Sequence, residues 1–428
     1  MMGKRKNTVV WLSAALFTIF LVMSMTGCSG KKDKVFTPRL DRETKVVLDV
    51  MGFFSNFEAL DQVTNDFNEI YPNVVFNYEQ VGGENLVSYL EANPGVDIFM
   101  TSDEILDSED GVLAGKCADL SKEDIRLDAI DEDMLNSYSY DGKLLSIPMS
   151  QNLYGIVVNV TLLEKEGLSV PQNYSEFLNA LDVLKNKGYV PIQGPSSKVY
   201  SELTINMILN IIGNDDELYN MLSAGDISAS KKLEPVFDIL DLFKEKGYFD
   251  LELNDTYPND NYDGAIMKFF EGDVPFWICN TEKVSGMKKR ETKSEAFKTE
   301  PFEYTYIFAP LGENGSYVYR EPWFGFAVSK ESDAYEYAVE FIRFLATRDE
   351  INKLAEIKGV PSAAVEHNDI EIYNNMFEVS KVESSLVKNE KITSQLMKAW
   401  YTCSYKYISG QYAGQKEAIE DFISKSGK

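Results

Sequence analysis

The amino-acid sequence predicts an α/β fold built from two lobes. Three observations lead to this prediction. Runs rich in β-branched residues alternate with segments of helical periodicity in both halves of the chain. A chain of 428 residues is longer than one hydrophobic core usually serves. The halves are joined by the stretch "LLSIPMSQNLYGIVVN", which leaves hardly any room for a linker.

The first half reads as three strands separated by two helices. Val46–Val50, 74–76 and 96–100 are short apolar or β-branched runs that predict strands. The segment 57–71 has apolar residues at helical spacing and ends at a proline, and 84–92 predicts a second helix. This alternation is typical of a parallel sheet covered by helices.

The second half continues the alternation and then becomes largely helical. We expect strands at 155–160, 190–194, 274–280, 304–310 and 322–330. The predicted helices are 174–187 with Asn173 as its cap, a block over 201–246 broken near Gly213 and Gly225, and the segments 333–347, 391–407 and 415–423.

The N-terminus has the features of an export signal. Lys4, Arg5 and Lys6 precede an almost wholly apolar run over 9–25. The run ends in Met25-Thr26-Gly27-Cys28, which resembles a bacterial lipobox. The resemblance implies that residues 1–27 are a lipoprotein signal peptide, that the chain is cleaved before Cys28, and that this cysteine carries lipid. Residues 28–45 would then be a lipidated tether, and the alternative is an uncleaved signal anchor.

Charge and composition restrict the classes of molecule that this protein is expected to bind. The chain has 68 acidic and 42 basic residues and a net charge of −26, so we expect no binding to nucleic acid through a basic surface. Cys117, Cys279 and Cys403 are far apart, so we interpret them as buried apolar residues. His367 is the only histidine, so we expect no His-rich metal site and no cofactor.

Four stretches together resemble the extracellular solute-binding proteins of family 1, the lipid-anchored sugar-binding components of bacterial ABC importers. They are "GVDIFMTSDE", "DGKLLSIPMSQNLYGIVVN", "AIMKFFEGDVPFWICN" and "PWFGFAVSKESDAYEYAVEFIRFLATRDEINKLAEIKGVPSA". They occur in the family's order. The Phe-Trp pair in the third stretch and the following "NTEK" depart from the family pattern, which leaves the class of ligand open.

The resemblance implies a periplasmic-binding-protein-like fold, in which two α/β lobes joined by a hinge enclose a ligand cleft. Carried onto this chain, lobe 1 would be 46–151 plus 306–330, and lobe 2 would be 152–305 plus 331–428. Residues 148–152 would form one hinge strand. The resemblance also implies a monomer at the outer face of the cell membrane that binds a carbohydrate and delivers it to permease subunits without any catalysis.

Ligands of open α/β sheets meet the carboxyl ends of the strands, and this rule selects candidate residues. Aromatic side chains can cover the apolar faces of a sugar, and carboxylates and amides can bond its hydroxyl groups. The candidates are Phe54, Ser55, Asp103, Glu104, Gln151, Asn152, Tyr154, Trp277, Asn280, Glu282 and Trp323.

Several candidates have an equally simple structural interpretation. Phe54 and Trp277 could belong to the core, and Asp103 and Glu104 could cap a helix. Gln151, Asn152 and Tyr154 could hold the hinge backbone. Three other functions also remain open from the sequence: a glycosidase that uses two carboxylates, a ligand-sensing or scaffold lipoprotein, and a binding protein for a peptide, a polyamine or a metal complex.

Overall fold

The computed structural model describes residues 36–55, 58–102, 106, 113–194, 199–256, 262–366, 373, 376 and 380–427. Leu40–Lys428 form one compact unit. None of the helices in the described part of the chain has both the length and the apolar character needed to cross a bilayer. The predicted signal peptide and Cys28 lie outside the described residues.

The first sheet confirms the parallel strands predicted for the first half. Its strand order is β2-β1-β3-β12-β6. β1 runs parallel to β2 from the pair Val46↔Val74 onward and parallel to β3, whereas β12 is antiparallel to both β3 and β6. The bounds are β1 Val46–Gly52, β2 Val74–Gln80, β3 Ile98–Thr101, β12 Gly325–Val328 and β6 Ile147–Pro148.

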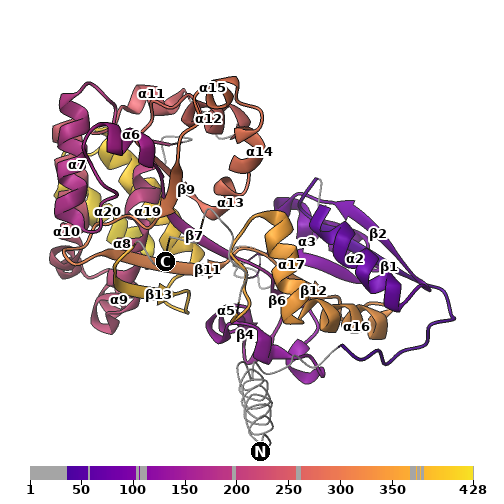
Figure 1. Ribbon diagram of the computed structural model, residues 1–428. Helices are drawn as coiled ribbons and strands as arrows, with labels where there is room; N and C mark the ends of the chain where they lie inside the picture. The colour runs from indigo at the N-terminus through magenta and orange to yellow at the C-terminus, as the bar shows by residue number, and fades with distance from the viewer. Residues whose placement is uncertain are drawn as a thin grey trace, which may run out of the picture. The chain divides into compact units, whose positions relative to one another are not determined.

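Helices from two distant parts of the chain cover the first sheet, and Figure 1 shows the indigo and orange helices side by side. Rings make much of this contact: Phe341 lies 5.1 Å from Phe67 and 4.8 Å from Phe76 between ring centroids. This sheet and its helices are called the first lobe below. The helices are α2 Glu58–Ile70, α3 Leu86–Ala92, α16 Tyr335–Leu345 and α17 Arg348–Lys358.

The second sheet is mixed and is organised around one long buried strand, β7. Its order is β13-β11-β7-β9-β8, and β10 also pairs with β7. β7 is antiparallel to β9, β10 and β11, whereas β8 is parallel to β9 and β13 to β11. The bounds are β7 Gln151–Asn159, β8 Ile192–Gln193, β9 Phe276–Asn280, β10 Tyr304–Ile307, β11 Ser316–Pro322 and β13 Val382–Val387.

The second sheet and the helices that pack on it are called the second lobe below. Helix α8 is its central helix. It is rich in apolar residues and buried along nearly its whole length, because it lies between the second sheet and helices α10 and α19. Asn173 caps α7 as predicted, since its side chain accepts a hydrogen bond from the Glu176 N–H. The helices are α6 Val160–Lys165, α7 Tyr174–Asn186, α8 Val199–Gly213, α9 Asp216–Ser223, α10 Ser230–Lys246, α19 Ser394–Ile408 and α20 Gln415–Ser426.

Besides short 3₁₀ helices, a few shorter elements complete the described chain. They are α5 Glu132–Ser137, the hairpin β4 Ser139–Tyr140 and β5 Lys143–Leu144, and the helices α11 Leu251–Asp255, α12 Tyr262–Phe269, α13 Thr281–Val284, α14 Met287–Glu291 and α15 Glu295–Thr299.

The chain passes between the two sheets at three described places, which together form the hinge. β6 leads into β7, and β11 leads into β12. The third is the segment 359–362 after α17. Backbone hydrogen bonds tie the three together, because the Met149 N–H donates to the Phe324 carbonyl and the Gln151 N–H to the Pro361 carbonyl, both at 2.9 Å. Residues 148–152, predicted as one hinge strand, are instead the end of β6, two residues between strands and the start of β7, and they lie beside the other two crossings.

The predicted lobe boundaries are wrong in two places. The segment 306–322 was expected in lobe 1, but β10 and β11 pair with β7 of the second sheet. The segment 331–358 was expected in lobe 2, but α16 packs on β1 and β12 of the first sheet, and α17 packs on α2. The periodicity of α16 identified its apolar face, but periodicity does not say which sheet that face covers.

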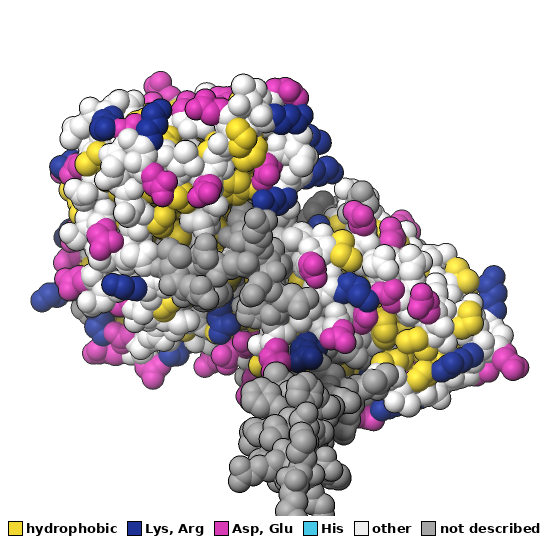
Figure 2. All heavy atoms as spheres, in the orientation of Figure 1, with side chains coloured by type: hydrophobic (Ala, Val, Ile, Leu, Met, Phe, Trp, Pro, Cys, Tyr) yellow, Lys and Arg dark blue, Asp and Glu magenta, His cyan; other side chains and the backbone are white. Residues whose placement is uncertain are grey.

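The described cysteines agree with the sequence analysis, and the charged side chains visible in Figure 2 are of both signs. Cys117, Cys279 and Cys403 are buried free thiols, as predicted. On the face that Figure 2 shows, acidic and basic side chains are interspersed over both lobes. The net charge of −26 is therefore not gathered into one acidic surface on that face.

Candidate functional site

Two aromatic side chains meet where β11 passes into the first sheet. Phe54 follows the carboxyl end of β1, and Trp323 lies between β11 and β12; their ring centroids are 5.3 Å apart with an interplanar angle of 63°. Both rings are half-buried, whereas Phe324, 5.3 Å from each, is fully buried beneath them. The pair therefore presents an apolar surface on a rigid base.

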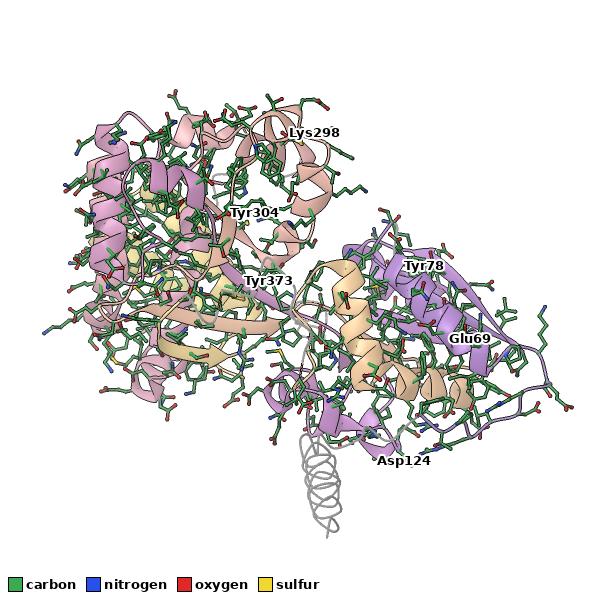
Figure 3. All side chains as sticks on the ribbon, viewed as in Figure 1. Glu69, Tyr78, Asp124, Lys298, Tyr304 and Tyr373 are labelled. Atoms are coloured by element: carbon green, nitrogen blue, oxygen red, sulfur yellow. The ribbon has the colours of Figure 1, made fainter. Side chains whose placement is uncertain are left out.

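Hydrogen bonds to the backbone fix the positions of both rings. The Tyr78 hydroxyl donates to the Phe54 carbonyl oxygen at 2.9 Å, and Tyr78 is labelled in the first lobe in Figure 3. The Trp323 N–H donates to the Ser150 carbonyl oxygen at 3.0 Å. Burial raises the pKa of Tyr78 to about 12. Phe54 is thereby tied to β2, and Trp323 to the hinge.

A lysine lies over these rings. Lys358 is the last residue of α17, and its Nζ lies 3.7 Å from the centroid of Phe54 and 5.6 Å from that of Trp323. Burial lowers the pKa of Lys358, and the charge of Glu282 opposes this effect. Gly359 follows with φ of 71°, a left-handed conformation that ends the helix directly after Lys358. The sequence analysis did not select this lysine.

The second lobe contributes a carboxylate to the same place. Glu282 lies in the first turn of α13, directly after β9, and its side chain is exposed. Although water reaches the side chain, the surrounding protein raises its pKa, and the charges of Lys283 and Lys358 and a hydrogen bond with Asn280 oppose this. The Asn280 Oδ1 also caps α13 by accepting from the Lys283 N–H at 3.2 Å. Asn280 therefore positions both Glu282 and α13.

An ion pair joins α13 to helix α8. The Lys283 Nζ lies 2.6 Å from an oxygen of Glu202 in the first turn of α8. Glu202 is 6% exposed, and its Oε2 has no hydrogen-bond partner. Burial is the largest single influence and lowers the pKa of Lys283, but the charge of Glu202, its hydrogen bond and the charge of Glu282 together raise the pKa above its usual value.

Asn152 and Tyr154 hold a second buried carboxylate, that of Glu321 on β11. The Asn152 Nδ2 and the Tyr154 hydroxyl donate to its Oε1 at 2.9 and 2.8 Å, and the Tyr319 hydroxyl donates to its Oε2 at 3.0 Å. Burial, followed by the charge of Glu321, raises the pKa of Tyr154 well above its usual value. These side chains join β7 to β11 and do not face solvent.

Gln151 likewise belongs to the hinge. Its Nε2 donates to the Ser362 carbonyl oxygen at 2.7 Å, and its Oε1 accepts from Arg320 at 3.5 Å. The side chain is 7% exposed and joins the passage from β6 to β7 to the segment 359–362. This agrees with the interpretation that Gln151 holds the hinge backbone.

Trp277 requires a correction. It is 1% exposed and lies in a hydrophobic cluster with Val157, Phe270 and Tyr306. A ring sealed in this cluster cannot stack on a solute, so Trp277 is a core residue. Alternate residues of a strand point to opposite faces, and both faces of β9 are buried, which the sequence could not reveal.

The structure thus brings together four of the predicted residues: Phe54 and Trp323 from the first-lobe side, and Asn280 and Glu282 from the second lobe. Ser55 is exposed beside Phe54. Asp103, Glu104 and His367 lie outside the described residues. The group Phe54, Trp323, Lys358, Asn280 and Glu282 is called the hinge site below.

The hinge site can offer a solute an apolar ring surface, a carboxylate, an ammonium group and an amide. No group of histidine, cysteine, aspartate and glutamate suited to a metal ion occurs among the described residues. Most polar groups around the site are held in fixed hydrogen bonds, which suits binding with defined geometry.

A separate open hollow of about 470 Å³ lies elsewhere in the first lobe. It sits near the residues that follow β12, at the edge of the first sheet opposite to Phe54, because β12 runs antiparallel to β3. Its lining is mostly charged and lacks a pair of stacked rings. The lining residues are Cys117, Ala118, Asp119, Lys122, Glu123, Lys143, Lys330 and Tyr335.

Comparison with known proteins gives a consistent result. The family model for bacterial extracellular solute-binding proteins matches residues 62–375. A multiple sugar-binding protein of Streptococcus mutans serotype c is 18% identical over 331 residues, which cover 75% of this chain and 76% of that protein.

Solved structures show the same fold. Apo RafE from Streptococcus pneumoniae matches with a TM-score of 0.71 and 17% identity, over 91% of this chain and 99% of that one. RafE in complex with raffinose matches with a TM-score of 0.68 and 18% identity, over 90% and 99% of the two chains. At such identities, the likeness establishes the bilobed α/β architecture.

Proposed function

Because this chain belongs to the bacterial extracellular solute-binding proteins, we propose that it captures a carbohydrate at the hinge site and delivers it to the permease of an ABC importer. The solute would be an oligosaccharide. No chemical step is needed, since transport by such a protein requires only capture and release.

The observation that carries this proposal is the pair Phe54 and Trp323, two half-buried rings 5.3 Å apart beside polar groups of the other lobe. A pyranose has apolar C–H faces, and planar rings cover such faces at low entropic cost. The carboxylate of Glu282 is suited to accept hydrogen bonds from sugar hydroxyls, because charged acceptors form stronger hydrogen bonds.

The position of the hinge site supports a capture mechanism. Phe54 and Trp323 belong to the first-lobe side, whereas Asn280 and Glu282 belong to the second lobe. A solute that contacted residues of both lobes would stabilise the conformation in which the lobes are closed around it. The stabilisation equals the difference between its binding free energies for the closed and the open conformations. A permease could then distinguish loaded from empty protein.

The relatives support the choice of a sugar. A protein with this fold has been solved with raffinose, and the curated relative is a multiple sugar-binding protein. For this chain we further propose that Cys28 carries the lipid anchor and that the protein works as a monomer at the outer face of the membrane. The basic start, apolar run and Gly27-Cys28 junction support the anchor.

A thermal-shift screen of residues 35–428 tests the proposal. This segment includes the compact unit Leu40–Lys428, so it contains the hydrophobic cores of both lobes. A ligand at 100 times its dissociation constant should stabilise the protein by about 2.7 kcal/mol, which should raise the Tm by a few degrees. The library contains mono- and oligosaccharides, polyamines and peptides.

Each result has a distinct meaning. A shift with one glycan series supports the proposal and identifies the sugar. A shift with polyamines or peptides alone would overturn the sugar assignment while leaving solute capture in place. No shift with any compound would contradict capture of these solutes and favour a sensing or scaffold role.

A further inference from the structure

The hinge site contains a contact that a bound sugar could not share. The Lys358 Nζ lies 3.7 Å from the centroid of the Phe54 ring, which is the distance of direct contact with the ring face. It also lies 5.6 Å from the Trp323 centroid, within the range of a cation–π interaction. A sugar that stacked on this face of Phe54 would have to occupy the space of the ammonium group.

The rest of the structure holds the lysine in this place. Ile351, Leu354 and Ala355 bury one side of α17, so the end of the helix is fixed. A cation at a helix C-terminus is favoured by the helix dipole. A Cβ added at Gly359 would lie 3.4 Å from the Ser285 carbonyl oxygen, so the segment after Lys358 also lies close to the end of α13.

The same surroundings would attract a cationic solute if the lysine were absent. Phe54 and Trp323 offer ring surface, and Glu282 offers a carboxylate whose charge acts on Lys358. Aromatic rings beside a carboxylate are the groups that recognise organic cations, quaternary ammonium compounds in particular. The chain as a whole carries a net charge of −26, which raises the local concentration of cations further.

We propose that Lys358 is a specificity-determining residue that covers the Phe54–Trp323 face in the ligand-free protein, so that cations are excluded and a neutral sugar must displace it. The displaced ammonium remains close to Glu282, the carboxylate of the other lobe with which it already interacts. This inference rests on the proposed function, because it takes the hinge site as the place where the sugar binds.

The first test needs no ligand. Lysines of the full chain, purified in detergent, are converted to ¹³C-dimethyl-lysines, and the Lys358 methyl signal is assigned by its absence in Lys358→Arg. Contact with the Phe54 ring face predicts an upfield ring-current shift, most of which Phe54→Leu removes because the Trp323 ring is farther away. An unshifted Lys358 signal would show that the ammonium does not cover the ring and would overturn the inference.

The second test compares affinities of Lys358→Met and the native chain for the glycan found by screening and for choline. Removing the competing ammonium should tighten glycan binding by about two- to thirty-fold, the range of cation–π strengths. It should also create choline binding that the native chain lacks and that Phe54→Leu/Lys358→Met loses. Lys416→Met, a lysine with an 88% exposed side chain in the distant helix α20, is the matched control and should change neither affinity.

The outcomes separate this inference from the proposed function. Glycan binding that weakens or stays unchanged in Lys358→Met would show that the lysine does not compete with the sugar, and would leave sugar capture intact. If no glycan bound either protein, the proposed function would fail. Even then, a ring-shifted Lys358 signal together with choline binding by Lys358→Met would establish that the lysine prevents cations from binding to the Phe54 and Trp323 rings.

Discussion

Lys283 in α13 and Glu202 in α8 form a 2.6 Å ion pair in which Glu202 is almost fully buried. The pair joins the helix that carries Glu282 to the central helix of the second lobe. Because Lys283 directly follows Glu282 in α13, the pair couples the stability of this lobe to the position of the candidate ligand-binding carboxylate.

Breaking this pair from one side should be costly. Lys283→Met leaves the Glu202 carboxylate buried without its cation, so we expect a loss of about 3–5 kcal/mol in the free energy of unfolding. The double variant Glu202→Gln/Lys283→Met removes both charges and should recover most of that loss. Urea unfolding of the native chain, the single variant and the double variant measures these free energies. A double variant no more stable than Lys283→Met would refute the coupling between the two side chains.

Glu321 should be needed for the stability of the hinge. Glu321→Ala removes the acceptor for Asn152, Tyr154 and Tyr319 and leaves their buried donors unpaired. We expect a loss of about 3 kcal/mol or more, since each unsatisfied buried group costs about 1–3 kcal/mol. Tyr319→Phe removes one donor to this buried carboxylate and should cost about 1.5–3 kcal/mol, less than the loss of all three bonds. Equal losses in the two variants would show that Glu321 is not the centre of this network.

Trp323 should be required for ligand binding but not for folding. Its ring is half-buried, so Trp323→Ala removes contact with a stacked solute while Phe324 still covers the core. We expect at least tenfold weaker glycan binding, about 1.4 kcal/mol, at a normal Tm. The control is Trp277→Phe in the core, which should lower the Tm and leave the affinity unchanged. Unchanged affinity in Trp323→Ala would remove this residue from the site.

The sequence predicted the elements of this fold better than their partners. The period of α16 and the β-branched run of β7 were both identifiable because each depends on neighbouring residues. That α16 returns to the first sheet depends on contacts such as Phe341 with Phe67, which join distant parts of the chain. The strand β13 was missed because it is largely exposed and polar, so it lacks an apolar pattern.

The residues of the candidate site that follow a local pattern were predictable from the sequence, and those brought in by long-range contacts were not. Phe54, Asn280, Glu282 and Trp323 follow or flank strand ends, so the rule for open sheets selected them. Lys358 sits at the end of a helix far along the chain, and no local pattern marks it. The glycine after it was the available signal, because Gly359 marks a helix end at which the preceding side chain can turn toward the hinge.

Membrane attachment should depend on Cys28. Cys28→Ala removes the thiol to which lipid would be joined, so we expect the protein to move from the membrane fraction to the aqueous phase in detergent phase partition. Cys403→Ala, a buried thiol in α19, serves as the control and should remain with the membrane. A Cys28→Ala protein that stayed in the detergent phase would indicate an uncleaved apolar anchor instead of a lipid.

Glu350 should make stability depend on pH in the direction opposite to an ordinary salt-bridged acid. Burial raises the pKa of Glu350 above 4.5, and Lys353, which donates to it at 2.8 Å, opposes this only in part. The folded protein therefore holds the proton more tightly than the unfolded chain. The penalty for ionising Glu350 is absent below pH 4.5 and complete above the raised pKa.

It follows that Glu350→Gln should stabilise the protein at pH 7.5 and lose this advantage as the pH falls toward 4.5. Asp349→Asn in the same turn is the matched control, since its side chain is 81% exposed and a negative charge there favours the helix N-terminus. That variant should be neutral or slightly destabilised at pH 7.5. Urea unfolding across this range decides the matter, because a Glu350→Gln advantage that grew on acidification would mean that the carboxylate is stabilised in the folded state.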